Sequence, residues 1–274
     1  MRFYSPACRD REDYRRAHRR ILRSYRADEK IVSVKRVVLL IALLCAACGY
    51  EGADNPLAVE RQGAVQWREG QTIVALGTSL TFGFGADCKV FPFDRDCALP
   101  DSSYPATLAA RLKLPVVNLG VPGATTRDGL LRMIEALTHD PALALIELGA
   151  NDLFQEVLVA DARANLVMII DRFHRAGVAV ALLSFSHPDM IDHTPPDHRL
   201  QDKKAEALAY HQMLLALADE FGLPIVEYIF EDIWWKEELM FDSVHPNGRG
   251  YLLMEENVVR GLHSFLAAND LYAQ

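Results

Sequence analysis

The chain has 274 residues, half of them apolar, which is enough to bury a sizeable core in one large domain or two small ones. Its formal net charge is −8, and residues 37–274 carry 32 acidic side chains against 17 basic ones. A body this acidic repels the phosphate backbone, so we expect no nucleic-acid partner.

The first 34 residues form an Arg-rich head, in which nine arginines and one lysine face five acidic side chains. Lys35 and Arg36 follow, and then an apolar run over residues 37–48. A short positive region, an apolar stretch and small residues are typical of a secretory signal. The run is shorter than the roughly 20 residues that a membrane-spanning helix needs. We therefore interpret residues 35–48 as a signal peptide, and residues 1–34 as the product of a start codon upstream of the true one.

The signal ends in Cys45-Ala46-Ala47-Cys48, which resembles a bacterial lipoprotein box, although Cys45 stands where leucine is usual. In such a box the cysteine after the cleavage point carries lipid on its sulfur. We therefore expect export to the periplasm and a lipid anchor at Cys48 that attaches the protein to a membrane. Plain secretion is the alternative.

After a polar linker, residues 49–70, short apolar segments alternate with segments of helical periodicity. Strands are expected at residues 72–76, 116–119, 142–148, 178–185 and 224–228. Helices are expected at residues 104–112, 127–137, 160–176, 208–221 and 250–267. Strands that are apolar on both faces and alternate with helices predict a parallel sheet covered on both sides. We therefore expect residues 71–274 to form a flavodoxin-like three-layer α/β/α sandwich with a five-stranded parallel sheet.

Two predicted connections, residues 82–103 and 186–201, are longer than usual, and long loops on an active face commonly shape substrate binding. The first contains Cys88 and Cys97. In an exported protein this pair predicts a disulfide, with two free thiols as the alternative. Two soft ligands are too few to favour a metal site there.

The turn after the first predicted strand reads Gly77-Thr78-Ser79-Leu80. Ser79 could cap a helix, or the glycine-rich turn could bind phosphate. The turn lacks the Lys-Ser/Thr of a P-loop and the Gly-x-Gly-x-x-Gly of a dinucleotide site. It also differs from the Gly-x-Ser-x-Gly elbow of α/β-hydrolases, because Thr81 occupies the last position. Ser79 therefore stands as a candidate nucleophile of another kind, or as a cap.

Near the C-terminus, Asp242 precedes His245 by three positions, and Pro246 follows. A carboxylate this close can accept a hydrogen bond from one ring nitrogen and leave the other free to take a proton from a serine. The alternatives are a helix cap made by Asp242 and a metal pair.

A second, looser group of metal-ligand types lies in the loop at residues 186–201 and consists of His187, Asp189, Asp192 and His193. Its spacing matches no clear metal motif. We therefore expect neither a metal nor a cofactor.

Two more blocks follow predicted strands, Asn118-Leu-Gly-Val-Pro-Gly123 and Leu148-Gly-Ala-Asn151-Asp152. Gly123 could be only a turn glycine, and Asn151 or Asp152 could cap a helix. As functional groups, a backbone N–H at Gly123 and the side-chain amide of Asn151 would donate to a developing oxyanion. One such donor is worth about 3 kcal/mol of barrier.

The four blocks in this order resemble those of the SGNH, or GDSL-type, hydrolase superfamily over roughly residues 72–270. Within it the chain is similar to bacterial thioesterase/protease/lysophospholipase enzymes and arylesterases. The resemblance implies that Ser79 is the nucleophile and also donates a backbone N–H. It implies that Gly123 and Asn151 complete the oxyanion hole, and that His245 and Asp242 complete the triad.

Two positions depart from the family pattern, Thr78 in place of the Asp of Gly-Asp-Ser and Ala150 in place of the second Gly of Leu-Gly-Gly-Asn-Asp. Neither departure removes a catalytic group.

We expect a serine ester hydrolase that cleaves small acyl or aryl esters, including lysophospholipids, through an acyl-enzyme and without a cofactor. The alternatives are a carbohydrate O-deacetylase or O-acyltransferase acting on envelope glycans, and a non-catalytic ligand-binding lipoprotein. An apolar substrate wall is predicted from Phe82, Phe84, Phe91 and Phe93.

Overall fold

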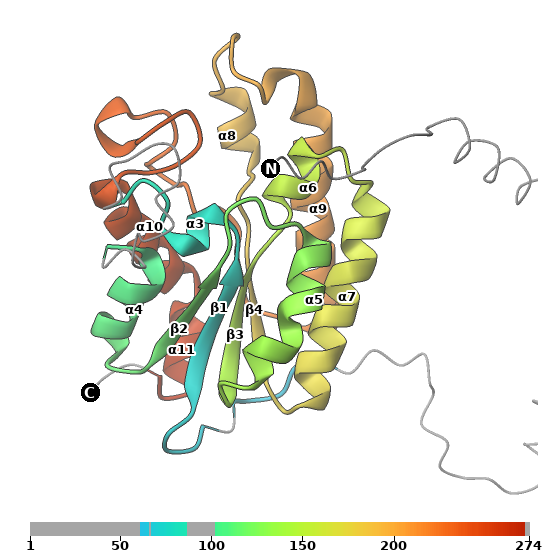
Figure 1. The fold of residues 1–274 in the computed structure, drawn as a ribbon, viewed down its shortest axis with the longest axis vertical. Helices are drawn as coiled ribbons and strands as arrows, with labels where there is room; N and C mark the ends of the chain where they lie inside the picture. The colour runs from blue at the N-terminus through green and yellow to red at the C-terminus, as the bar shows by residue number, and fades with distance from the viewer. Residues whose placement is uncertain (1–60, 66, 87–101, 272–274) are drawn as a thin grey trace, which may run out of the picture. The chain divides into compact units, whose positions relative to one another are not determined.

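A parallel β-sheet organises the part of the chain that the computed structural model describes, residues 61–65, 67–86 and 102–271 (Figure 1). Within those residues the sheet has five strands in the order β2-β1-β3-β4-β5. The strands are β1 (Thr72–Gly77), β2 (Val116–Gly120), β3 (Pro141–Glu147), β4 (Ala179–Leu183) and β5 (Ile225–Val226). All neighbouring strands are parallel, which confirms the predicted sheet.

Several predictions concern residues outside the described part of the chain, and the structure does not test them. They are the Arg-rich head at 1–34, the signal at 35–48 with its lipid on Cys48, the disulfide between Cys88 and Cys97, and the wall residues Phe91 and Phe93.

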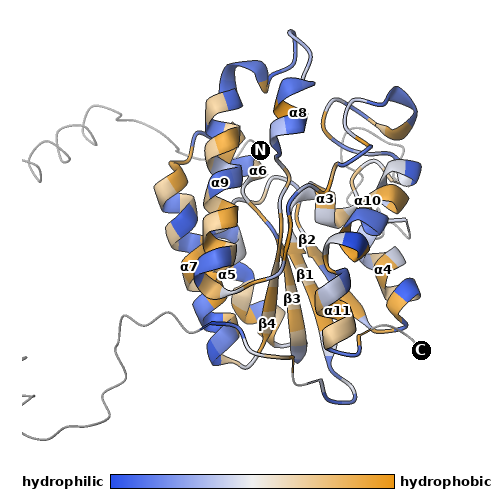
Figure 2. Ribbon diagram, turned by 180° about the vertical axis from the view of Figure 1, so that it is seen from behind, coloured by the Kyte–Doolittle hydropathy of each residue, from blue (hydrophilic) through white to orange (hydrophobic). Residues whose placement is uncertain are grey.

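Helices cover both faces of the sheet, as Figures 1 and 2 show from opposite sides. One face carries α4 (Tyr104–Leu112), α10 (Gly248–Gly261) and α11 (His263–Ala268). The other face carries α5 (Thr126–Leu137), α7 (Val159–Arg175) and α9 (Lys204–Phe221). The predicted three-layer α/β/α architecture is therefore confirmed. In the described residues, no helix has both the length and the apolar character that crossing a bilayer requires.

The layers follow from the apolar pattern of the sequence. The side chains from Ile73 to Leu76 in β1 have no exposed surface, and every residue of β3 is buried. A strand buried on both faces needs helices on both sides. The helices bury one stripe each, as the hydropathy colouring in Figure 2 shows. In α7 this stripe recurs every three or four residues at Leu166, Ile169, Ile170 and Phe173.

The structure differs from the sequence prediction at several element ends. β4 and β5 are shorter than predicted, since they cover Ala179–Leu183 and Ile225–Val226. Just after β4, the Ser184 hydroxyl donates a hydrogen bond to the carbonyl of Ser186. The predicted C-terminal helix is divided, since Leu262 has a ψ of 4° that interrupts it between α10 and α11. Five short helical segments were not predicted: α3 (Ser79–Phe82), α6 (Ala150–Phe154), α8 (Pro188–Asp192), η1 (Gln201–Lys203) and η2 (Glu237–Leu239).

The register of β1 with its two neighbours, β2 and β3, determines where the site forms. Gly77 at the end of β1 lies opposite Gly120 of β2 on one side and Glu147 of β3 on the other. The turns that follow these strands contain three of the four blocks identified in the sequence. They therefore emerge side by side at the carboxyl edge of the sheet, where sites in such folds form.

Gly120 provides a test of this packing. A Cβ at Gly120 would lie 2.1 Å from the backbone nitrogen of Phe82 in α3. Because backbone cannot give way as a side chain can, we expect Gly120→Ala to lower the free energy of unfolding by about 3 kcal/mol. Urea denaturation measures the change. The control is Gly63→Ala, where no atom lies within 4 Å of the added carbon. Wild-type stability in Gly120→Ala would contradict the close approach.

Candidate active site

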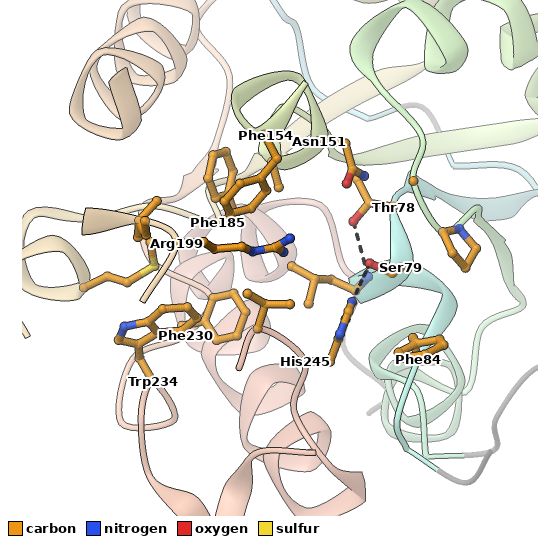
Figure 3. Close-up of a pocket in the computed structure, with 17 residues that line it drawn as sticks. Thr78, Ser79, Phe84, Asn151, Phe154, Phe185, Arg199, Phe230, Trp234 and His245 are labelled. Atoms are coloured by element: carbon orange, nitrogen blue, oxygen red, sulfur yellow. Dashed lines mark hydrogen bonds between the residues drawn. The ribbon is translucent and has the colours of Figure 1, made fainter. Parts of the chain in front are cut away.

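Ser79 is the first residue of α3, the short helix that follows β1. Thr78, rather than Ser79, caps this helix, because its Oγ1 accepts a hydrogen bond from the Leu80 nitrogen at 3.3 Å. The Ser79 hydroxyl has a different partner. Its Oγ lies 2.9 Å from Nε2 of His245, which comes from a turn 166 residues further along the chain (Figure 3).

His245 is oriented by a carboxylate on its own turn. Nδ1 of the imidazole lies 2.8 Å from Oδ2 and 3.0 Å from Oδ1 of Asp242. Since an ionised carboxylate can only accept, Nδ1 carries the proton and the lone pair of Nε2 faces the Ser79 hydroxyl. Asp242 does not cap the following helix, because Asn247 caps α10.

The Asp242 carboxylate is fixed by its own turn as well. Its Oδ1 accepts hydrogen bonds from the backbone N–H groups of Val244 and His245, each at 2.8 Å. Partial burial works to raise the pKa of Asp242. The hydrogen bond and charge of His245 and the two N–H groups outweigh that effect, and the pKa of Asp242 lies below its ordinary value. The carboxylate therefore stays ionised at neutral pH, as orientation of the imidazole requires.

A buried carboxyl lies beneath the Ser79 turn. Oε2 of Glu147, at the end of β3, accepts from the backbone nitrogen and Oγ1 of Thr78 at 3.0 and 2.8 Å, and from Oγ1 of Thr81 at 2.9 Å. Tyr104 extends the network through its hydroxyl, 3.1 Å from Thr81 Oγ1. Burial raises the pKa of Glu147 to about 7, although these hydrogen bonds act to lower it. In the sequence Glu147 is a single acidic residue in an otherwise apolar strand, and this pattern does not reveal its contact with the Ser79 turn.

Asn151 and Gly123 border the space in front of Ser79. Gly123 has a φ of +84°, which favours glycine, and no atom lies within 4 Å of where a Cβ would stand. Asn151 donates one amide hydrogen to the Ala124 carbonyl at 2.9 Å, and this bond fixes the direction of its side chain. The amide has a second hydrogen with which it can donate.

The helix-cap alternative for this block is wrong. The N-cap of α6 is Gly149, and no side chain bonds there. Asp152 is buried and accepts from the backbone nitrogen and the hydroxyl of Thr126 at 2.8 and 2.6 Å. It thereby ties α6 to the start of α5 and supports the position of Asn151.

Ser79, His245, Gly123 and Asn151 all line one cavity of about 250 Å³ (Figure 3). The rest of its wall is mainly apolar. The apolar lining residues are Leu80, Phe84, Pro122, Ala150, Phe154, Phe185, Met190, Leu200, Phe230, Trp234 and Val244. The site therefore combines a polar reaction end with a space suited to a hydrocarbon or aromatic group.

Among the predicted wall residues that the structure describes, Phe84 lines the cavity and Phe82 does not. The Phe84 ring packs on the His245 imidazole, with ring centroids 4.7 Å apart. No sequence pattern predicts the other aromatic lining residues, because they come from segments far apart in the chain.

The loop at residues 186–201 does not bring its four residues of metal-ligand type together. In the described part of the chain, a group of three potential ligand atoms that all lie within 4.8 Å of one another is formed by His187, His211 and Glu227. His211 is buried, and its Nδ1 lies 3.3 Å from the Ser184 hydroxyl. Burial and the nearby His187 lower the pKa of His211. None of these three residues lines the cavity around Ser79.

A hydroxyl, an imidazole and a carboxylate in a hydrogen-bonded line, beside candidate oxyanion donors, form the arrangement that proteins use for nucleophilic acyl transfer. Residues 75–253 match the sequence profile of the GDSL-like Lipase/Acylhydrolase family. The chain therefore belongs to this family, and the resemblance seen in the sequence is confirmed.

Curated relatives agree with this family. Thioesterase 1/protease 1/lysophospholipase L1 of Escherichia coli strain K12 is 26% identical over 180 residues, which cover 64% of this chain and 76% of the relative. An arylesterase of Vibrio mimicus is 27% identical over 195 residues, covering 70% and 88%.

Solved structures support the same fold. The crystal structure of TesA has a TM-score of 0.60 and 25% identity, and the match covers 72% of this chain and all of TesA. AlinE4, described as an SGNH-hydrolase family esterase, has a TM-score of 0.51 and 27% identity, with coverages of 73% and 97%.

The raised pKa of Glu147 predicts a pH dependence of stability. Between pH 4.5, its ordinary pKa, and about 7, the folded protein holds a proton that the unfolded chain has released. The stabilisation from this group is therefore complete below pH 4.5 and is lost as the pH rises through 7. At about 1.4 kcal/mol per pKa unit, the stability of the wild type relative to Glu147→Gln should fall by about 2–3 kcal/mol between pH 4.5 and 8.

Urea unfolding at both pH values measures this difference. Glu237→Gln, the same change at an exposed position, is the control. Parallel pH profiles for wild type and Glu147→Gln would show that Glu147 holds no such proton.

Proposed function

We propose that this protein is a serine ester hydrolase in which Ser79 is the nucleophile, His245 the general base and Asp242 the residue that orients the base. The supporting observation is the line of hydrogen bonds from Ser79 Oγ to His245 Nε2, 2.9 Å, and from His245 Nδ1 to Asp242 Oδ2, 2.8 Å, at the mouth of an apolar cavity. Membership of an acylhydrolase family supports the same reaction class.

In this mechanism Ser79 Oγ attacks the ester carbonyl carbon as its proton passes to His245 Nε2. The tetrahedral intermediate collapses, the bond to the alcohol oxygen breaks, and the alcohol leaves with the proton from His245. Water then attacks the acyl-enzyme, again giving a proton to Nε2. The second collapse releases the carboxylic acid and returns the proton to Ser79.

We propose that the negative charge of each tetrahedral intermediate is stabilised by the backbone N–H groups of Ser79 and Gly123 and by the amide of Asn151. The open space at Gly123 and the fixed direction of the Asn151 side chain support these roles. Donors that are already in place cost no reorganisation when the charge develops.

The substrates we propose are acyl or aryl esters, with lysophospholipids and thioesters within the class. The apolar lining of the cavity supports this choice over the acetylated glycans considered from the sequence. The names of two relatives, thioesterase 1/protease 1/lysophospholipase L1 and an arylesterase, support the same choice. A panel of short and long p-nitrophenyl esters beside O-acetylated sugars tests the preference, and faster turnover of the sugars would reverse it.

The triad has a direct test. We expect Ser79→Ala or His245→Ala to lower kcat on a p-nitrophenyl ester by several orders of magnitude, and Asn151→Ala to lower it about 10²- to 10³-fold. Circular dichroism would establish that each variant is folded. A fluorophosphonate probe should label wild type and not Ser79→Ala. Wild-type activity in folded Ser79→Ala would show that the nucleophile lies elsewhere.

We further propose that the enzyme acts outside the cytoplasm as a lipoprotein, on the sequence of residues 35–48. Mass spectrometry of protein purified from a bacterial membrane fraction should find a chain that begins at a lipid-modified Cys48. The Cys48→Ser variant should be found in the soluble fraction instead. An intact Arg-rich head on the purified wild type would count against this processing.

A further inference from the structure

A cationic side chain projects into the otherwise apolar cavity. Arg199 is the one lysine or arginine among the described residues that line it. Figure 3 shows its guanidinium inside the cavity, pointing toward the end that holds Ser79. The guanidinium carbon lies 3.9 Å from the centre of the Phe154 ring, a cation–π contact that holds it against the wall.

The backbone on each side of Arg199 is anchored, so the direction of its side chain is built into the fold. Both neighbours, His198 and Leu200, are buried. Nδ1 of His198 accepts from the Leu200 nitrogen at 3.1 Å, and its Nε2 therefore donates to the Ser243 carbonyl at 3.0 Å. Ser243 belongs to the turn that carries Asp242 and His245. The Arg199 loop and the proposed base are thus tied to each other.

The charge of Arg199 is not neutralised within the described part of the chain. No carboxylate there lies within ion-pair distance of its guanidinium, and no hydrogen bond to it is formed. Burial lowers the pKa of Arg199, and the charge of Asp242 acts against that effect. Asp242, however, is engaged by His245 at 2.8 Å. Arg199 itself is exposed although it lines the cavity, so its charge is accessible to an anion that enters there, and such an anion can form an ion pair with the guanidinium.

We propose that Arg199 binds a negative charge on the substrate, so that the enzyme prefers esters that carry a carboxylate or phosphate over neutral esters of the same length. This inference rests on the proposed ester hydrolase function. The planar guanidinium donates two parallel hydrogen bonds, which suit a carboxylate or phosphate group. The apolar wall around it accepts the chain or ring that joins this anion to the ester.

Matched ester pairs test the proposal and locate the charge. The first pair, mono-p-nitrophenyl glutarate and p-nitrophenyl pentanoate, differs by a negative charge in the acyl group. The second pair, 4-acetoxybenzoate and 4-acetoxybenzamide, differs by a negative charge in the leaving group. The quantity compared is the anionic-to-neutral ratio of kcat/KM in wild type and in Arg199→Met, because a ratio of ratios cancels the intrinsic reactivity of each ester.

We expect this ratio to fall about 10- to 100-fold in Arg199→Met for one pair, the range that hydrogen bonds to charged groups contribute. Arg199→Lys should retain part of the preference, because it keeps the charge and loses the paired donors. The preference of the wild type for the anionic ester should also weaken as salt is added, because salt screens an ion pair that is exposed to solvent. Arg175→Met, on the outer surface of α7, is the control and should leave both ratios unchanged.

An unchanged ratio in Arg199→Met for both ester pairs would overturn the proposal. If kcat/KM fell equally on the anionic and the neutral esters, this same outcome would assign Arg199 to the reaction itself. Calorimetric binding of mono-p-nitrophenyl glutarate and p-nitrophenyl pentanoate to Ser79→Ala, with and without Arg199→Met, measures the same preference without turnover. Failure of the wild type to hydrolyse any ester would refute the proposed function, whereas turnover with an unchanged ratio would refute only the role of Arg199.

Discussion

The parallel pairing of β1 with both of its neighbours is the constraint on which the site depends. Because Gly77 lies opposite Gly120 and Glu147, three strands end at one level and their turns lie side by side. Close packing is possible only because position 120 has no side chain to meet the backbone at Phe82. The buried Glu147 carboxyl then accepts from the backbone and hydroxyls of the Ser79 turn. The position of one hydroxyl is thus set by strand register and by a carboxyl on the adjacent strand.

The fold, and the meeting of the polar candidate residues in one place, could be predicted from the sequence because both follow from local patterns. β3 is apolar on both faces, which indicates a covered parallel strand, and Asp242 and His245 are near enough in sequence for their interaction to be inferred. The cavity wall could not be predicted in this way. Phe154, Phe185, Phe230 and Trp234 are ordinary apolar residues in separate segments, and only tertiary packing brings them together.

The two phenylalanines after Ser79 also show that sequence proximity does not predict which residues line the cavity. Phe82 and Phe84 are both near Ser79 in sequence, yet only Phe84 lines the cavity. Proximity along the chain was the basis for predicting both. However, Phe82 is the last residue of α3, and the chain changes direction at Gly83, whose φ is +88°, before it reaches Phe84. Glu147 was equally hard to interpret, since a single acidic residue in an apolar strand does not reveal which donors surround it.

The local character of the pair formed by Asp242 and His245 has a consequence for how such an enzyme can change. The hydrogen bonds that hold Nδ1 of the imidazole against Asp242, and the Asp242 carboxylate in its turn, come from within four consecutive residues, so this contact is built locally. Phe230 and Trp234 lie in the connection that leads from β5 to this turn. Substitutions in that connection can therefore reshape the wall of the cavity without removing the contact between Asp242 and His245. A change in which groups fit the cavity does not require a change in this pair.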